Sequence, residues 1–170
     1  MLENKNILIG ITGGIAAYKI CELVRLYRKA RANVRVVLTP NALNFVTKLT
    51  LQTLSNNEVY VDNFEIDEYK PEHIALTEAD IFVIAPASAN TISKLANGIC
   101  DNLLLSTACA FNKPFLIAPA MNTNMWENPF VQENLSKLRK NGYNILEPDE
   151  GYLACGTNGK GRMREVEEIF

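Results

Sequence analysis

Histidine is nearly absent from this chain of 170 residues, since His73 is the only one. The four cysteines, Cys21, Cys100, Cys109 and Cys155, stand singly rather than in the short-spaced pairs of metal ligands. This argues against a structural zinc site, which needs four such ligands. Three of them, Cys21, Cys100 and Cys109, lie in or beside apolar stretches, and we expect them to be small core residues.

The chain also lacks a strong net charge and a long apolar run. Its 17 lysines and arginines against 19 aspartates and glutamates give a formal charge of -2, which provides no electrostatic reason to expect nucleic acid or an anionic membrane surface. No apolar run approaches the ~20 residues of a membrane span. The first residues carry no signal-peptide pattern. We therefore expect a cytoplasmic protein without nucleic-acid or membrane partners.

Hydrophobic residues, at 48%, are sufficient for one substantial core, so we expect a single domain over residues 1–170. Apolar runs of strand length alternate with helical patterns, which predicts an α/β fold: a Rossmann-like or flavodoxin-like parallel sheet with helices on both faces. The expected strands are 6–12, 33–39, 80–86, 114–118 and 143–146. The expected helices are 15–30, 88–97, 101–111 and 129–140, with short helical starts at 42–45 and 165–170. Residues 49–54 fit a helix or a strand, and 56–72 and 149–163 are expected to be loops.

The segment Pro119-Ala120-Met121-Asn122-Thr123-Asn124-Met125-Trp126 lies where a strand ends and a helix begins. In open α/β sheets, ligands bind at the carboxyl ends of the strands. Asn122 and Asn124 offer uncharged amides, and Met121, Met125 and Trp126 could form an apolar wall. The same residues also fit a turn with helix-capping asparagines and a buried Met/Trp pair.

Two further strand–helix junctions are rich in small residues. Gly13-Gly14 opens the first helix, where free backbone N–H groups favour a phosphate, although neither G-x-G-x-x-G nor a Walker A sequence is present. A tight turn that needs glycine is the alternative. At Pro86-Ala87-Ser88-Ala89-Asn90-Thr91, small residues would let a flat ring approach the backbone. An N-cap cluster fits that junction equally well.

Near the C-terminus, Cys155 lies in a glycine-rich segment that could act as a mobile flap, or be a solvated loop. Lys160 and Arg162 in that segment could contact an anionic group. His73, just ahead of the third strand, is a candidate for catalysis, although a lone histidine is more often structural.

These elements, in this order, resemble the flavin-dependent cysteine decarboxylases, and among them the phosphopantothenoylcysteine decarboxylases of coenzyme A biosynthesis. The resemblance spans nearly the whole chain. The residues that carry it are Gly13-Gly14-Ile15-Ala16-Ala17-Tyr18-Lys19, His73, Ser88-Ala89-Asn90-Thr91, Pro119 to Trp126, Ala154-Cys155-Gly156 and Gly161-Arg162-Met163.

The resemblance implies a site for FMN and for a cysteine-derived carboxylate. His73 would be the base or orienter beside the flavin, and Cys155, on a substrate clamp over 149–163, would be the proton donor. Asn122 would bind the substrate carboxylate region, and we expect Met125, Lys160 and Arg162 also to contact substrate. The residues expected to contact FMN are Gly13, Gly14, Ile15, Thr39, Ser88, Ala89, Asn90, Thr91 and Ala120.

The implied reaction is FMN-dependent decarboxylation of 4′-phospho-N-pantothenoylcysteine to 4′-phosphopantetheine through thioaldehyde and enethiolate intermediates. Family members form trimers or multiples of trimers, and many are fused to a phosphopantothenate–cysteine ligase. One departure is Thr157, where the family commonly has Asp, so a charge is missing beside Cys155. A peptidyl-cysteine decarboxylase and a non-catalytic binding subunit of the same fold are the alternatives.

Overall fold

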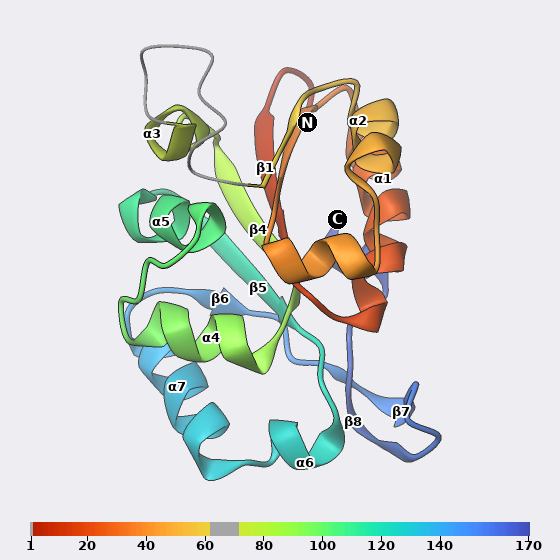
Figure 1. Cartoon of the computed structure of the whole chain (residues 1–170), viewed down its shortest axis with the longest axis vertical. Helices are drawn as coiled ribbons and strands as arrows, with labels where there is room; N and C mark the ends of the chain where they lie inside the picture. The colour runs from red at the N-terminus through yellow and green to blue at the C-terminus, as the bar shows by residue number, and fades with distance from the viewer. Residues whose placement is uncertain (1, 62–71) are drawn as a thin grey trace.

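The computed structural model describes residues 2–61 and 72–170, and for Glu72 and His73 the backbone alone. A parallel sheet of six strands runs through the molecule, with helices on both faces (Figure 1). Its strands lie in the order β3-β2-β1-β4-β5-β6, which confirms the predicted α/β fold. Their bounds are β1 Asn6–Ile11, β2 Asn33–Leu38, β3 Val59–Tyr60, β4 Ile81–Ala87, β5 Phe115–Pro119 and β6 Asn144–Ile145.

The two layers of helices divide the core between them. One face of the sheet packs against α1, α2 and α8, and the other against α3, α4, α5 and α7. The helices are η1 Ile15–Lys19, α1 Ile20–Lys29, η2 Pro40–Asn44, α2 Lys48–Ser55, α3 Glu72–Leu76, α4 Ala89–Ala96, α5 Leu103–Ala110, α6 Thr123–Trp126, α7 Pro129–Lys140 and α8 Val166–Ile169. In the described residues, none is long and apolar enough to cross a membrane.

Strand β1 shows why the central strands are continuously hydrophobic. Ile7, Ile9 and Ile11 belong to the first core cluster and Leu8 to the second, because successive side chains point to opposite faces. Each is at most 2% exposed. A strand covered on both faces needs an apolar residue at every position, as the sequence has here.

The strand order reverses between β1 and β4, which are parallel neighbours. Thr12 joins the carboxyl ends of these two strands: its Oγ1 donates to Pro86 O at 2.6 Å and accepts from Ser88 N at 2.9 Å. The Thr12 side chain is buried, so water cannot replace either bond. The crevice at this reversal is where open α/β sheets bind ligands.

The prediction of a loop over 149–163 was wrong. Strands β7 (Asp149–Tyr152) and β8 (Asn158–Arg162) form an antiparallel hairpin there. These strands were not predicted because they lack alternating apolar residues and contain three glycines between them. Their pairing is stabilised by backbone hydrogen bonds and by contact with the segment after β5.

Smaller differences have local causes. The helix expected over 15–30 begins as the 3-10 turn η1 before α1, and α6 is an additional short helix inside the expected turn over 119–126. Residues 49–54 are helical, as part of α2. The loop expected over 56–72 includes the short strand β3, and its residues 62–71 lie outside the described part.

Two of the expected core cysteines are exposed. Cys100 lies in the connection between α4 and α5, and Cys109 lies at the exposed C-terminal end of α5. Cys21 is half-buried, and burial raises the pKa of its thiol. Cys100 and Cys109 therefore lie outside the core although their neighbours in the sequence are apolar.

We expect Thr12→Val to destabilise the protein by about 1–3 kcal/mol, because an isosteric methyl leaves Ser88 N–H without its buried partner and leaves Pro86 O with only the longer bond from the backbone N–H of residue 12. Urea unfolding followed by circular dichroism measures the change. Thr53→Val is the control: this exposed hydroxyl bonds only to Leu49 O within its helix, and its loss should cost under about 0.5 kcal/mol. Equal losses in both variants would contradict the role of Thr12.

Candidate active site

A cavity of about 660 Å³ opens at the carboxyl edge of the sheet, next to the reversal between β1 and β4. Its walls come from the turn before η1, the end of β4, the segment after β5 and the β7–β8 hairpin. A volume of this size is typical of small-molecule sites. Among its lining residues are the predicted site residues Gly13, Gly14, Ile15, Ser88, Ala89, Ala120, Asn122, Met125, Cys155 and Arg162.

Four predicted residues with described side chains do not line this cavity. Thr91 is buried behind Ser88, whose Oγ accepts from Thr91 N, and Asn90 is exposed on α4. Lys160 is bonded to Glu147 at 2.6 Å and lies over the Trp126 ring. Thr39 is buried at the end of β2, and within the described residues its Oγ1 has no hydrogen-bond partner.

His73 lies at the opposite edge of the sheet from the cavity. Its helix, α3, precedes β4, whereas the cavity is at the carboxyl end of that strand (Figure 1). Strand β4 has seven residues, so the two edges are about 20 Å apart. The structure therefore does not bring His73 to the cavity of its own chain.

The two glycines of the first turn have different functions. A Cβ on Gly13 would lie 2.7 Å from Asn41 Cβ, so this position needs glycine to pack against η2. A Cβ on Gly14 would meet nothing within 4 Å. The backbone at Gly14 is consequently open to the cavity that it lines.

Asn122 both caps a helix and lines the cavity, which are the two interpretations that its sequence context allowed. Its Oδ1 accepts from Asn124 N at 2.8 Å and so caps α6, while its Nδ2 donates to Cys155 Sγ at 3.6 Å. Cys155 is at the tip of the β7–β8 hairpin, 33 residues further along the chain. The cap fixes the orientation of the amide. Because Oδ1 is held by Asn124 N, Nδ2 points toward the thiol of Cys155.

The pKa of the Cys155 thiol is lowered from its ordinary value, chiefly by the hydrogen bond from the Thr157 side chain, then by a backbone hydrogen bond from Thr157, with a smaller contribution from Asn122. The Sγ–Oγ1 distance to Thr157 is 3.1 Å. Burial has the opposite effect on Cys109, raising its pKa to about 11 with help from Cys100. Cys155 is thus the thiol best placed for proton transfer.

Two glycines of β8 let the hairpin approach the segment after β5. A Cβ on Gly161, whose φ is +144°, would overlap Met121 O, and a Cβ on Gly159 would overlap Thr123 Oγ1. Met121 N donates to Gly161 O at 3.0 Å. Only glycine permits this contact, and the contact is what brings Cys155 to Asn122.

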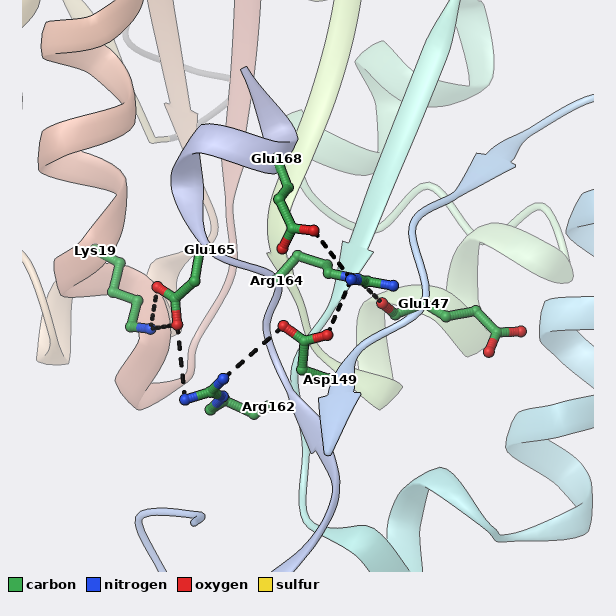
Figure 2. Close-up of polar contacts among 7 residues, drawn as sticks. All are labelled: Lys19, Glu147, Asp149, Arg162, Arg164, Glu165 and Glu168. Carbon is green, nitrogen blue, oxygen red and sulfur yellow. Dashed lines mark hydrogen bonds and ion pairs between the residues drawn. The ribbon is translucent and has the colours of Figure 1, made fainter. Parts of the chain in front are cut away.

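Ion pairs tie the base of the hairpin to the C-terminal segment (Figure 2). Arg164 contacts Asp149 and Glu168, both at 3.0 Å, while Glu165 lies between Lys19 and Arg162. Of these residues, only Lys19 and Arg162 line the cavity. In the part of the chain that the structure describes, no cluster of three or more His, Cys, Asp or Glu could hold a metal.

The Flavoprotein family model matches residues 1–170. The chain belongs to the Flavoprotein family. Among curated relatives, the coenzyme A biosynthesis bifunctional protein CoaBC of Bacillus subtilis is 49% identical over 173 residues, covering 99% of this chain and 42% of that protein. The probable phosphopantothenoylcysteine decarboxylase of Streptococcus mutans is 43% identical over 170 residues, covering 98% and 95%.

Solved structures share this flavoprotein fold closely. A PPC decarboxylase with a cysteine-to-serine mutation, in complex with pantothenoylaminoethenethiol, superposes with a TM-score of 0.87 at 36% identity, covering 98% of this chain and 94% of that chain. The FMN-dependent cysteine decarboxylase SpaF gives a TM-score of 0.89 at 30% identity, with 99% and 94% covered. The chain spans less than half the length of the first CoaBC relatives.

Some residues of this flavoprotein site were not predicted from the sequence. Lys19, Tyr18, Tyr152, Leu153 and Met163 also line the cavity. Lys19 follows the glycine turn by five residues, a position that the 3-10 geometry of η1 presents to the cavity, whereas a regular helix was expected there. Tyr152 lines it because 149–152 is a strand, which the sequence did not indicate.

We expect Gly161→Ala to release the hairpin from the segment after β5, because a Cβ at φ +144° overlaps Met121 O. Backbone strain alone is worth about 1–3 kcal/mol, so amide exchange in the hairpin and at Met121 should accelerate about 10- to 100-fold. Hydrogen–deuterium exchange measures this. Gly142→Ala is the control. Its φ of +87° also strains an alanine, but no atom lies within 4 Å of the added Cβ, so amide exchange in the hairpin should stay unchanged.

We expect Thr157→Val to raise the pKa of Cys155 toward the ordinary thiol value, because the valine cannot hydrogen-bond the thiolate. Alkylation of Cys155 would then need a higher pH than in the unmodified protein. Peptide-resolved mass spectrometry across a pH series measures the shift, and Cys109 in the same sample is the internal reference. An unchanged Cys155 profile would remove Thr157 from this role.

Proposed function

We propose that this flavoprotein catalyses FMN-dependent decarboxylation of 4′-phosphopantothenoylcysteine to 4′-phosphopantetheine. The observation that carries the proposal is the contact of Asn122 Nδ2 with Cys155 Sγ at the wall of the cavity. It pairs a neutral amide, suited to a carboxylate, with a thiol of lowered pKa, suited to proton delivery. The names of the Streptococcus relative and of the PPC decarboxylase structure support the same substrate.

The residues present fit FMN. Gly14 and Ala89 line the cavity as small residues that a flat ring can approach. Thr39 lies outside that lining, but its N–H bonds Ile11 O at the end of β1, just before the glycine turn, and its buried Oγ1 has no partner within the described residues. An additional polar group there would satisfy that hydroxyl. When bound, FMN supplies two-electron oxidation of the substrate's thiol-bearing carbon and returns the electrons after CO2 has left.

Asn122 would hold the substrate carboxylate without pairing it to a charge. An ion pair would stabilise the ground-state carboxylate, which must be lost as CO2, whereas a neutral amide orients it at lower cost. Cys155 would then protonate the carbon that CO2 leaves. Thr157 supports this protonation better than the Asp that the family commonly has at this position, because a hydroxyl can donate to a thiolate and a carboxylate cannot.

His73 is proposed to act on the cavity of a second copy of the chain. The length of β4, about 20 Å, separates it from the cavity of its own chain. A homo-oligomer, a trimer or a multiple of trimers, would allow α3 of one copy to face the cavity of another.

The source of the substrate points to a second activity. The CoaBC relatives are named as bifunctional and are more than twice as long as this chain. We propose that a phosphopantothenate–cysteine ligase, fused or separate, supplies the substrate in the cytoplasm.

Incubation with FMN and 4′-phosphopantothenoylcysteine should yield 4′-phosphopantetheine, identified by mass through loss of CO2. Cys155→Ser should still release CO2 but accumulate an oxidised product, because the seryl hydroxyl is too weak an acid for the last protonation. Turnover of a peptide with a C-terminal cysteine instead would favour the peptidyl-cysteine decarboxylase. A protein that takes up no FMN would favour the non-catalytic binding subunit.

A further inference from the structure

Two exposed thiols outside the cavity lining lie beside each other. Cys100 is in the connection that runs from α4 to α5 (Figure 1), and Cys109 is in the last turn of α5. Ser106 joins the two segments, because its Oγ donates to Cys100 O at 3.3 Å. Cys109 follows Ser106 by three residues and so shares its face of the helix. Helical side chains lean toward the N-terminus, which brings the Cys109 thiol over the turn that holds Cys100.

The two thiols are unequal in acidity. The Cys109 side chain hydrogen-bonds with that of Cys100. Partial burial, then this hydrogen bond and the charge of a Cys100 thiolate, raise the pKa of Cys109 to about 11. Cys109 therefore keeps its proton at neutral pH and can donate it to a thiolate on Cys100. Such a pair combines a thiol that can act as the nucleophile with one that stays protonated beside it.

The segment that carries Cys100 can adjust its position. Residues 97–101 are all exposed, and none belongs to the buried part of either core cluster. The Cys100 thiol donates within this segment, to Gly98 O at 3.6 Å. Gly98 itself has φ +67°, with no atom within 4 Å of an added Cβ. A disulfide, which needs Cβ atoms about 3.5–4.5 Å apart, would thus move an exposed connection rather than the core.

We propose that Cys100 and Cys109 are a reversible modification site, at which the disulfide of a low-molecular-weight thiol oxidises the pair to an intramolecular disulfide. The Cys100 thiolate attacks one sulfur of the small disulfide, forms a mixed disulfide and expels one small thiolate. Cys109 then loses its proton and attacks the Cys100 sulfur, which releases the second small thiol. Two electrons and two protons pass from the protein to the small disulfide, which leaves as two thiols.

The arrangement limits how far Cys100 is oxidised. A second thiol beside a reactive one forms a disulfide before the irreversible sulfinic and sulfonic acids are reached. Cys155 is exposed as well, but its thiol contacts Asn122 and Thr157. A small disulfide should therefore leave a stable mixed disulfide on Cys155, and this gives a comparison within the same molecule.

The experiment treats the FMN-loaded protein with glutathione disulfide and maps the cysteines by peptide mass spectrometry without reduction. The unmodified protein should yield a peptide that links Cys100 to Cys109 with the loss of two hydrogens, and dithiothreitol should restore both thiols. Cys109→Ser should accumulate glutathione on Cys100, because the second thiol is gone. Cys100→Ser should react at Cys109 about 10-fold more slowly than Cys109→Ser reacts at Cys100, because the raised pKa leaves less thiolate.

A further variant tests the geometry of the pair. Ser106→Ala removes the hydrogen bond to Cys100 O and should slow closure of the mixed disulfide about 2- to 10-fold. Ser93→Ala is the matched control on α4. Its Oγ accepts from Asn134 Nδ2 at 3.1 Å, away from the thiols, so the rate of closure should stay unchanged.

Stable glutathione adducts on both Cys100 and Cys109 of the unmodified protein, with no linked peptide, would overturn the proposal. A linked peptide that occurs only in disulfide dimers, with a yield on non-reducing gels that rises with protein concentration, would do so too. None of these measurements requires turnover, so they are independent of the proposed decarboxylation.

Discussion

The close contact between β8 and the segment after β5 is the constraint on which the candidate site depends. The β7–β8 hairpin has few apolar side chains of its own, and Gly159 and Gly161 let its backbone lie directly against Met121 and Thr123. A hairpin alone is marginal in water, so this contact determines where it lies. Cys155 reaches Asn122 because this contact holds the hairpin along β8, while ion pairs hold its base.

The opposite wall of the cavity rests on a different interaction. Thr12 ties the end of β1 to the end of β4, at the point where the strand order reverses. The Gly13-Gly14 turn and Ser88 follow directly from these strands, so one buried hydroxyl sets the spacing of two walls. This wall belongs to the rigid sheet, whereas the hairpin wall is attached through glycines. A site built in this way can admit a ligand on the hairpin side while the sheet side stays fixed.

The sheet could be predicted because burial on both faces gives β1 and β4 nearly continuous apolar runs, and β2 carries an alternating one. The glycine turn, the Ser88 junction and Asn122 could be placed at the carboxyl edge by topology alone. The hairpin could not be predicted. Gly159 and Gly161 are required by a contact with the segment after β5, and sequence periodicity carries no signal of such a contact. The same topology puts His73, ahead of β4, at the opposite end of that strand, so a role beside the cavity cannot be derived from one chain.

The lining of the cavity combines neutral residues, Asn122 and Cys155 among them, with two cations. At the reacting end, a charge beside the carboxylate would stabilise the state that has to be lost, and Asn122 and Cys155 are neutral. Lys19 and Arg162 are the only charged residues of the described lining, and Glu165 lies 3.0 Å from Lys19 and 3.7 Å from Arg162. Binding energy gained away from the reacting atoms can be used to orient them. Under the proposed function, the lining thus leaves Asn122 and Cys155 uncharged beside the substrate carboxylate and pairs its two cations with Glu165.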